Sequence, residues 1–406
     1  MKSEQSCLKV TEDLTRHPEQ SPAEGVGCVS AEDSFTSSGQ SLVAGSSLPR
    51  VSCDNLPGVV WHMSRFSWCR RIILNYSHIK IEKGTTKITG TARYAVQQDI
   101  GLDPNSNKFG EHVDVTLIEK HGTVKSPQVS FESGCTGCNP LYARPWQGFT
   151  AIGEQETKQK DFNRYVPIQN GTKVDVDWGW EMVIKHAGVA LDTKITWGDV
   201  GARCDNKVAG NRGCVVPAFT PTLYIDYAKR QAAAAMIVEA QQKNLQHWGL
   251  RGKGKPLTRL ADDKETQKNR DITRPSDWIP PDGLEKGSCD EFPFASTYQS
   301  GTKGGVHSGD QCAQLFSWQS PNGDWWVEEW EHKNEIVVAP CIRANTPLIQ
   351  NTSVGGDLGR FTQDIRLLDA DPYWVQVIDT RRGIPTDEET RCHLEQRPNC
   401  HRPTNP

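Results

Sequence analysis

The 406-residue sequence lacks any long apolar segment. A membrane-spanning helix needs about 18 or more consecutive apolar residues, and no run here approaches that length, so we predict no membrane span. The first residues, MKSEQSCLKVTEDLTRHPEQ, also lack the apolar core of a secretory signal peptide. We therefore expect a mature form, a fragment, or a protein that is exported by another route.

A strong excess of either charge is absent too. The net charge of −4 gives the chain as a whole no attraction to nucleic acid. Lysine and arginine are nevertheless concentrated between residues 229 and 280, which contain eleven of them against six aspartates and glutamates. The densest part is RGKGKPLTR, residues 251–259. Such a basic, glycine-containing loop can lie against phosphate groups, and a solvated surface is the alternative.

Cysteine, by contrast, is abundant. Several of the thirteen cysteines lie close together in the sequence, which predicts local disulfides formed in an oxidising compartment and therefore a secreted protein. The predicted pairs are Cys135 with Cys138, Cys204 with Cys214, and Cys392 with Cys400. Zinc binding by the CTGC segment is the alternative, but no second cysteine or histidine pair follows at zinc-finger spacing.

Composition and periodicity divide the first half of the chain into two parts. Residues 1–55 are rich in Ser, Glu, Gly and Pro, which predicts a disordered tail or linker. Residues 56–220 contain short segments with period-two alternation, such as KVDVDWGWEMVI, and no helical patterns between them. We therefore predict an antiparallel β-sandwich-like accessory domain. Its tryptophans are interpreted as core residues, with carbohydrate-stacking platforms as the alternative.

A second domain, α+β in character, is predicted for residues 221–380. It begins with the strand TPTLYIDY, which is followed by AKRQAAAAMIVEAQQKNLQHWG. The spacing of Ala233, Met236, Ile237 and Ala240 predicts a helix with one apolar face that ends near Gly249. Residues 381–406 are predicted to be a C-terminal tail that carries a disulfide.

The segment CDEFPFASTYQSG, residues 289–301, is the strongest candidate for chemistry. It places Asp290 and Glu291 beside Phe292, Pro293 and Phe294, which would lower the local dielectric. A carboxylate in such surroundings must be paired or must hold a metal, and it can become basic enough to take a proton from water. The alternative is an exposed turn or strand edge in which one acid caps the backbone.

This segment, together with NTSVGGDLGRFTQDIRLLDADPYWV at residues 351–375, resembles the NucA/NucB family of secreted deoxyribonucleases, especially its actinobacterial members. The resemblance covers residues 225–378. It depends on the Asp-Glu-aromatic-Pro sequence, a downstream asparagine turn with paired glycines, and a closing Asp-Pro, aromatic and valine strand. In this chain the asparagine turn consists of Asn351, Gly355 and Gly356, and the closing strand contains Asp371, Tyr373 and Val375.

The resemblance implies a ββα-metal nuclease fold in which aspartate replaces the usual histidine base. It implies that Asp290 activates water, that Glu291 orients this water or supports the metal, and that Asn351 holds the active-site turn or joins the ligands. The family's metal ligand falls nearest Gln363, with Asp364 beside it, and the implied cation is Mg²⁺ or Mn²⁺. The candidate phosphate contacts are Lys255, Arg259 and Arg270, and the implied partner is single- or double-stranded DNA.

The chain departs from the family pattern at two places. Many relatives have glutamate where this chain has Gln299, and Asp-Asn-Ser where it has Gln350, Asn351 and Thr352.

The segment 317–335 is rich in Trp and Glu, and it could form a strand pair or a partner-binding hairpin. His307 and His332 are alternative bases outside any recognisable motif.

The leading hypothesis is therefore a secreted, metal-dependent DNA endonuclease. One alternative is a non-catalytic binding or adhesion protein with a decayed nuclease domain. Another is a nuclease toxin of a competition system, which would need an immunity or inhibitor protein as its partner.

Overall fold

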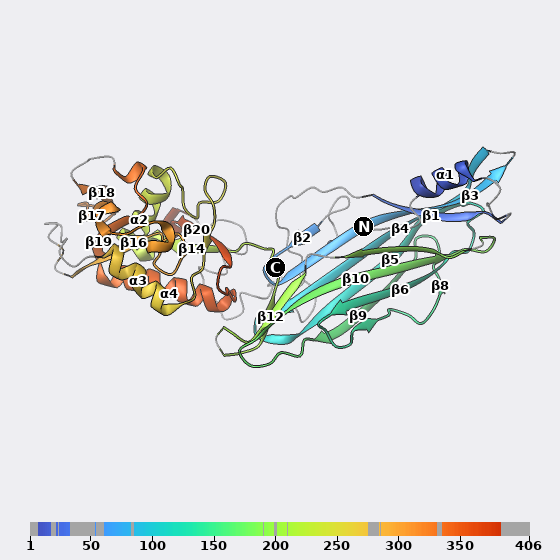
Figure 1. The fold of residues 1–406 in the computed structure, drawn as a ribbon, viewed down its shortest axis with the longest axis horizontal. Helices are drawn as coiled ribbons and strands as arrows, with labels where there is room; N and C mark the ends of the chain where they lie inside the picture. The colour runs from blue at the N-terminus through green and yellow to red at the C-terminus, as the bar shows by residue number, and fades with distance from the viewer. Residues whose placement is uncertain are drawn as a thin grey trace. The chain divides into compact units, whose positions relative to one another are not determined.

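The computed structural model describes residues 7–17, 22, 24–32, 53, 61–82, 85–189, 191–198, 201–208, 210–274, 284, 286–330 and 335–382. The fold divides into two compact units between Phe219 and Thr220. The first unit is built from antiparallel sheets, and the second combines helices with two smaller sheets (Figure 1). An all-β region followed by an α+β region is thus confirmed.

Two sheets form the first unit. The first sheet has the order β1-β3-β4-β5-β9, and β2 pairs with β3. Its strands are β1 (Val26–Glu32), β2 (Trp61–Met63), β3 (Ser67–Glu82), β4 (Thr85–Asp103), β5 (Ser106–Gly122) and β9 (Thr157–Tyr165). The second sheet has the order β13-β12-β10-β6-β7, with β11 on β10 and β8 on β6. Its strands are β6 (Gln128–Thr136), β7 (Tyr142–Ala143), β8 (Thr150–Ala151), β10 (Lys173–Lys185), β11 (Thr193–Gly198), β12 (Ala202–Asp205) and β13 (Gly213–Val215).

A single apolar core lies between these sheets, as the alternation of the sequence predicts. Strand β10 buries Val176, Trp178, Trp180 and Met182 and leaves the intervening residues at least partly exposed. Trp180 meets Trp68 of β3 edge to face, with ring centroids 5.4 Å apart. The tryptophans of β10 are therefore core residues, and the interpretation as sugar-stacking platforms is wrong for them.

A buried ion pair of the first sheet also hydrogen-bonds to the second sheet. Arg164 of β9 donates from Nε to Glu111 of β5 at 2.7 Å, and both side chains are fully buried. The guanidinium also donates from Nη2 to the Ser133 carbonyl of β6 at 2.9 Å. The second carboxylate oxygen of Glu111 accepts the Trp180 indole N–H at 3.0 Å. One carboxylate thus connects four strands and has its charge compensated inside the core.

The prediction of a disordered tail at residues 1–55 is wrong for two segments. Helix α1 (Cys7–Arg16) and strand β1 lie within it, and β1 pairs with β3 over its whole length. A disulfide between Cys7 and Cys28 links the helix to the strand. The average composition hid this because the segment VGCV is short and pairs with Tyr76–Ile79 of β3, residues that lie much further along the chain.

Disulfides join five pairs of described cysteines. The predicted pairs Cys135–Cys138 and Cys204–Cys214 are present, whereas Cys392 and Cys400 lie outside the described residues. Three further pairs link more distant positions, namely Cys7–Cys28, Cys53–Cys69 and Cys312–Cys341. Among the described cysteines, only Cys289 is a free thiol.

The second unit contains two sheets and three α-helices. One sheet has the order β14-β20-β15, and the other has the order β16-β19-β17-β18. The strands are β14 (Thr222–Asp226), β15 (Leu257–Thr258), β16 (Gly287–Phe292), β17 (Ala313–Gln319), β18 (Trp325–Glu329), β19 (Ile342–Pro347) and β20 (Pro372–Ile378). The helices are α2 (Tyr227–Lys243), α3 (Asp263–Thr273) and α4 (Leu348–Asp364), and short 3-10 turns are η2 (Gly301–Gly304), η3 (Gly309–Gln311), η5 (Glu335–Val337) and η6 (Thr380–Arg382).

The predicted alanine-rich helix corresponds to α2, and its apolar face is buried as expected. The helix ends at Lys243, six residues before the predicted end at Gly249. Asn244 stops it because this residue has an extended backbone and its side-chain amide donates to the carbonyls of Ile336 and Ala339. Those partners are nearly one hundred residues away, so no local pattern indicates the stop.

The Trp- and Glu-rich segment forms a strand pair where it is described. Strand β17 pairs with β18 in antiparallel register, so that Trp318 lies opposite Trp326. Among the described residues, no helix combines the length and the apolar character that crossing a bilayer requires.

We expect Arg164→Met to destabilise the first unit by roughly 3–5 kcal/mol, because it leaves the Glu111 carboxylate buried without its cation. Urea unfolding followed by tryptophan fluorescence measures this loss. The matched control is Lys87→Met, which removes a cation from an exposed ion pair with Glu82 and should leave the transition almost unchanged. Equal effects of the two variants would contradict a structural role for the buried pair.

Candidate functional site

Asp290 and Glu291 lie on β16, an outer strand of the four-stranded sheet. The strand pairs with β19 so that Asp290 is opposite Ala344 and Glu291 is opposite Arg343. Successive side chains of a strand point to opposite faces of the sheet. The two adjacent carboxylates therefore point to opposite faces of the sheet, while their charges still act on each other.

Asp290 shares its face of the sheet with Ser288 and with apolar residues. Its apolar neighbours on that face, by register, are Phe292, Ala344 and Leu315, and the residue is only 6% exposed. Burial, and secondarily the charge of Glu291, raises the pKa of Asp290 to about 7. The charge of Arg274 offsets a part of this shift, and so does the backbone N–H of Glu291, which donates to Asp290 Oδ1 at 3.0 Å. The carboxyl group can therefore gain or lose a proton near neutral pH.

Glu291 points to the other face and is neutralised there. Burial raises its pKa, while an ion pair with Arg274 and the charge of Arg270 oppose the rise. Arg274 follows the C-terminal end of α3, so this helix brings its cation to the strand. Cys289 shares this face, and burial together with the charge of Glu291 raises the pKa of its thiol to about 12. The thiol is therefore protonated and unreactive near neutral pH.

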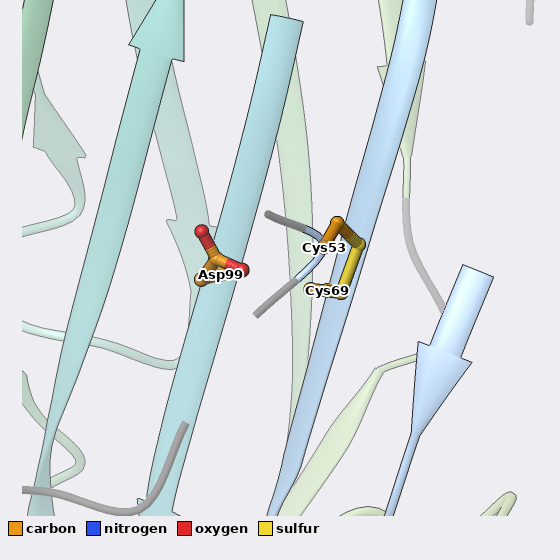
Figure 2. A group of neighbouring side chains, drawn as sticks. All are labelled: Cys53, Cys69 and Asp99. Carbon is orange, nitrogen blue, oxygen red and sulfur yellow. A yellow bond between two sulfur atoms is a disulfide. The ribbon is translucent and has the colours of Figure 1, made fainter. Parts of the chain in front are cut away.

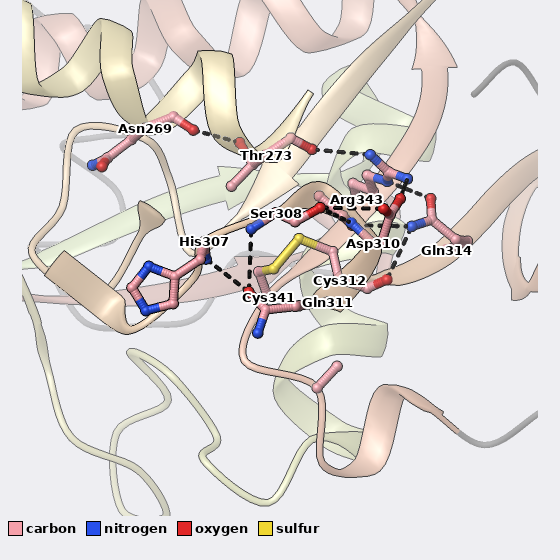
Figure 3. Close-up of a disulfide and its surroundings, with 12 residues drawn as sticks. Asn269, Thr273, His307, Ser308, Asp310, Gln311, Cys312, Gln314, Cys341 and Arg343 are labelled. Atoms are coloured by element: carbon pink, nitrogen blue, oxygen red, sulfur yellow. Dashed lines mark hydrogen bonds and ion pairs between the residues drawn. A yellow bond between two sulfur atoms is a disulfide. The ribbon is translucent and has the colours of Figure 1, made fainter. Parts of the chain in front are cut away.

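Arg343 of β19 fixes α3 over the same face of the sheet. It donates from Nη1 to the Thr273 carbonyl at 3.3 Å and from Nε to the Gln314 side chain. Figure 3 shows these contacts beside the Cys312–Cys341 disulfide, which joins the start of β17 to the start of β19. The face that carries Glu291 is thus a rigid, internally paired polar layer.

Asn351 is the predicted residue that the fold brings to β16. Its Nδ2 donates to Ser288 Oγ at 2.9 Å and to the Cys289 carbonyl at 3.3 Å. Ser288 and Asp290 are two residues apart on the strand and share a face. Positions that are 63 residues apart in the sequence therefore meet within two residues of Asp290.

The turn with paired glycines is not formed. Asn351, Gly355 and Gly356 all lie inside α4, which runs without a break from Leu348 to Asp364. Gln363 and Asp364 are exposed at the far end of this helix, about 18 Å from Asn351 along its axis at about 1.5 Å per residue. The predicted ligands Gln363, Asp364 and Glu291 therefore do not assemble into a cation site.

The two departures from the family pattern have structural explanations here. Gln350 accepts the Ala232 N–H at 2.9 Å and donates to the Gln231 side chain at 2.7 Å. Gln299 accepts the N–H of Thr258 at 2.9 Å and donates to its hydroxyl at 2.9 Å. A carboxylate could only accept, so an amide suits both positions.

The three candidate phosphate contacts lie in different environments. Arg259 is half-buried and donates from Nη1 to the Leu367 carbonyl, and burial lowers its pKa. This guanidinium therefore has a structural partner, which makes it a poor phosphate contact. Lys255 is exposed, and Arg270 lies near enough to Glu291 to lower its pKa. Of the alternative bases, His307 is exposed on a loop before η3, and His332 lies outside the described residues.

Among the described residues, just one group of three possible metal-ligand atoms lies close together, namely those of Cys53, Cys69 and Asp99 (Figure 2). The two sulfur atoms are bonded to each other. They are therefore not thiolates, and this group does not bind a metal in the oxidised protein.

Sequence reasoning missed Arg274, Arg343 and Ser288. Arg274 could have been found, because it lies four residues after Arg270 and follows a helical segment with a clear N-terminal Asp262 cap. Arg343 and Ser288 gain their positions through strand pairing and through α4, which no local pattern indicates.

Comparison of the chain with models of known protein families gives no match, and comparison with curated proteins gives no match either.

We expect Arg274→Met to destabilise the second unit by roughly 1.5–3 kcal/mol at pH 8, because it leaves Glu291 buried and unpaired. The loss should shrink as the pH falls towards the ordinary pKa of a glutamate, because the carboxyl group then becomes neutral. Urea unfolding at several pH values measures this trend. Lys268→Met, on the exposed side of α3, is the control and should have little effect. A pH-independent loss for Arg274→Met would assign the effect to packing.

Proposed function

We propose that the second unit is a phosphodiester hydrolase that cleaves DNA, single- or double-stranded, with Asp290 as the general base. The observation that carries the proposal is the contact of Asn351 with Ser288 and Cys289. The two segments that resemble the NucA/NucB deoxyribonucleases are far apart in the sequence, and they meet beside Asp290, a carboxylate whose pKa is near 7.

The proposed step needs an ionised Asp290. The carboxylate takes a proton from water, the water oxygen forms a bond to phosphorus, and the ester P–O bond on the opposite side breaks. A base with a pKa near the working pH combines a large ionised fraction with adequate proton affinity. Asn351 and Ser288 supply the polar groups beside it, and Arg270 and Lys255 remain the candidate phosphate contacts.

A requirement for Mg²⁺ or Mn²⁺ is part of the proposal through the resemblance alone, since the predicted ligands are dispersed. The test is to incubate the full chain with supercoiled plasmid and with circular single-stranded DNA, with either cation or with a chelator. Cleavage that the chelator stops supports a metal-dependent nuclease. Cleavage that continues in the presence of the chelator would mean that the hydrolase does not require a divalent cation.

Asp290→Asn should lower the rate of DNA cleavage about a hundredfold to ten-thousandfold, because the amide keeps the shape but cannot accept the proton. DNA binding, measured by fluorescence anisotropy, should stay near the wild-type level. Asp271→Asn, on the exposed side of α3, is the matched control and should cleave normally. Wild-type turnover by Asp290→Asn would remove Asp290 as the base and leave His307 as the next candidate.

The pH dependence of stability gives a test that does not depend on activity. The pKa of Asp290 is raised from 3.8 to about 7 in the folded state, so its ionisation destabilises the fold as the pH rises through this interval. Asp290→Asn should therefore be more stable than the wild type at pH 8 and equally stable near pH 4. Urea unfolding at both pH values measures the difference. An equal stability at pH 8 would mean that the carboxylate is already compensated.

The basic stretch can be tested separately by its effect on DNA binding. Lys253 and Lys255 are exposed, so Lys253→Gln combined with Lys255→Gln should flatten the salt dependence of binding. Each lost phosphate contact lowers the log-log slope by about 0.9 on duplex DNA. The same change at Lys87 and Lys173 of the first unit is the control. An unchanged slope would identify the stretch as solvated surface.

A second candidate function is binding without catalysis. Asp290 is only 6% exposed, and Glu291 is neutralised by Arg274, as in a site that has lost its chemistry. Absence of cleavage of both DNA substrates with either cation would favour this function. The disulfides suit an oxidising compartment, and we extend the proposal to a secreted protein. If the nuclease acts in competition between cells, an immunity or inhibitor protein is its expected partner.

A further inference from the structure

A hollow of about 400 Å³ lies on the outward face of the second sheet of the first unit. It extends over β6 and β10, which lie side by side in Figure 1, and over β7 and β11. Its volume is within the range of roughly 300–1,000 Å³ that is usual for small-molecule sites. The residues that line it are Glu132, Gly134, Tyr142, Gly179, Trp180, Glu181, Thr196, Trp197 and Gly198.

The floor of the hollow is open backbone at Gly179 and Gly198, whereas the Tyr142 ring lies close to Gly134. Gly134, Gly179 and Gly198 lie opposite one another on three neighbouring strands, in continuous register. Trp180 and Trp197 also line the hollow, but their side chains point into the core, since both residues are almost fully buried. Glycine inside a strand weakens it, and it often marks a bulge, a tight bend, or a site where a ligand or another backbone approaches closely.

The packing of the protein itself does not require the central glycine. A Cβ atom on Gly179 would meet nothing within 4 Å, and one on Gly198 would make just an ordinary contact of 3.5 Å with the Trp178 carbonyl. Neither residue has a positive φ. A larger side chain could therefore be accommodated at position 179, and what the glycine preserves is the open space.

The rim combines an aromatic ring with balanced charges. Tyr142 lies opposite Gly134 and is 60% exposed. Glu132 and Glu181 lie opposite each other, and cross-strand pairs of like charge are unfavourable unless they are compensated. Arg144 pairs with Glu132, and Lys194 pairs with Glu181 at 2.5 Å. The rim thus offers hydrogen-bond acceptors and donors with no net charge.

We propose that this hollow binds the ring of a neutral saccharide. A sugar ring has an apolar C–H face that can pack on the Tyr142 ring, and hydroxyl groups that both donate and accept. Carboxylates next to ammonium and guanidinium groups match such hydroxyls, whereas a cationic ligand would need acids without cations beside them. This inference concerns the first unit and does not depend on the proposed nuclease function.

The test uses the full chain and three neutral probes, cellopentaose, maltopentaose and penta-N-acetylchitopentaose, in isothermal titration calorimetry. At least one should bind, and Gly179→Leu, which fills the hollow, should weaken it at least about tenfold. Tyr142→Ala, on another strand, should also weaken binding. Gln128→Leu places the same side chain on the same face of β6, six residues from Gly134, and should bind like the wild type.

Two results would overturn the proposal. One is that none of the three saccharides binds, or that choline binds in their place. The other is that Gly179→Leu and Tyr142→Ala both fold, as judged by circular dichroism, and still bind the saccharide as the wild type does.

Discussion

The cost of burying a carboxylate governs both units of this protein. Glu111 lies at the centre of the first unit and is compensated by Arg164 and by the Trp180 indole. Glu291 of the second unit is compensated by Arg274. Asp290 is equally buried, but it shares its face of the sheet with apolar neighbours and accepts a backbone N–H. Its pKa rises to about 7 because burial is the dominant influence on it.

The fold follows from the sequence where the decisive interactions are local. Alternation in KVDVDWGWEMVI predicts the buried face of β10, and alanine-rich periodicity predicts α2. Strand β1 and the end of α2 escape prediction because partners far away in the sequence determine them. Strand β1 obtains its hydrogen bonds from β3, and Asn244 obtains its partners from the segment around Ile336 and Ala339.

The candidate site shows the same limit more sharply. The sequence identifies Asp290 as the important residue, because a carboxylate beside Phe292 and Phe294 is costly. It also suggests that Glu291 acts with it, since the two are adjacent. Strand geometry reverses that suggestion, because adjacent residues of β16 face opposite sides. The two carboxylates thus point to opposite faces because they are adjacent on a strand. Helix α4, in contrast, brings Asn351 to Ser288, although the two residues are 63 positions apart in the sequence.

The loss of stability that Asp290 causes helps to distinguish a catalytic site from a site that has lost its catalytic function. Burial keeps the pKa of Asp290 raised despite the charge of Arg274, so its ionisation destabilises the fold, and an apolar residue at that position would relieve this cost. Gln350 and Gln299 of the second unit each accept a backbone N–H and also donate to a side-chain oxygen, which a carboxylate could not do. Asp290 gives up local stability where Gln350 and Gln299 satisfy their partners, and such a local cost is typical of functional residues. That contrast favours a role for the Asp290 carboxylate in chemistry over its persistence as a structural residue.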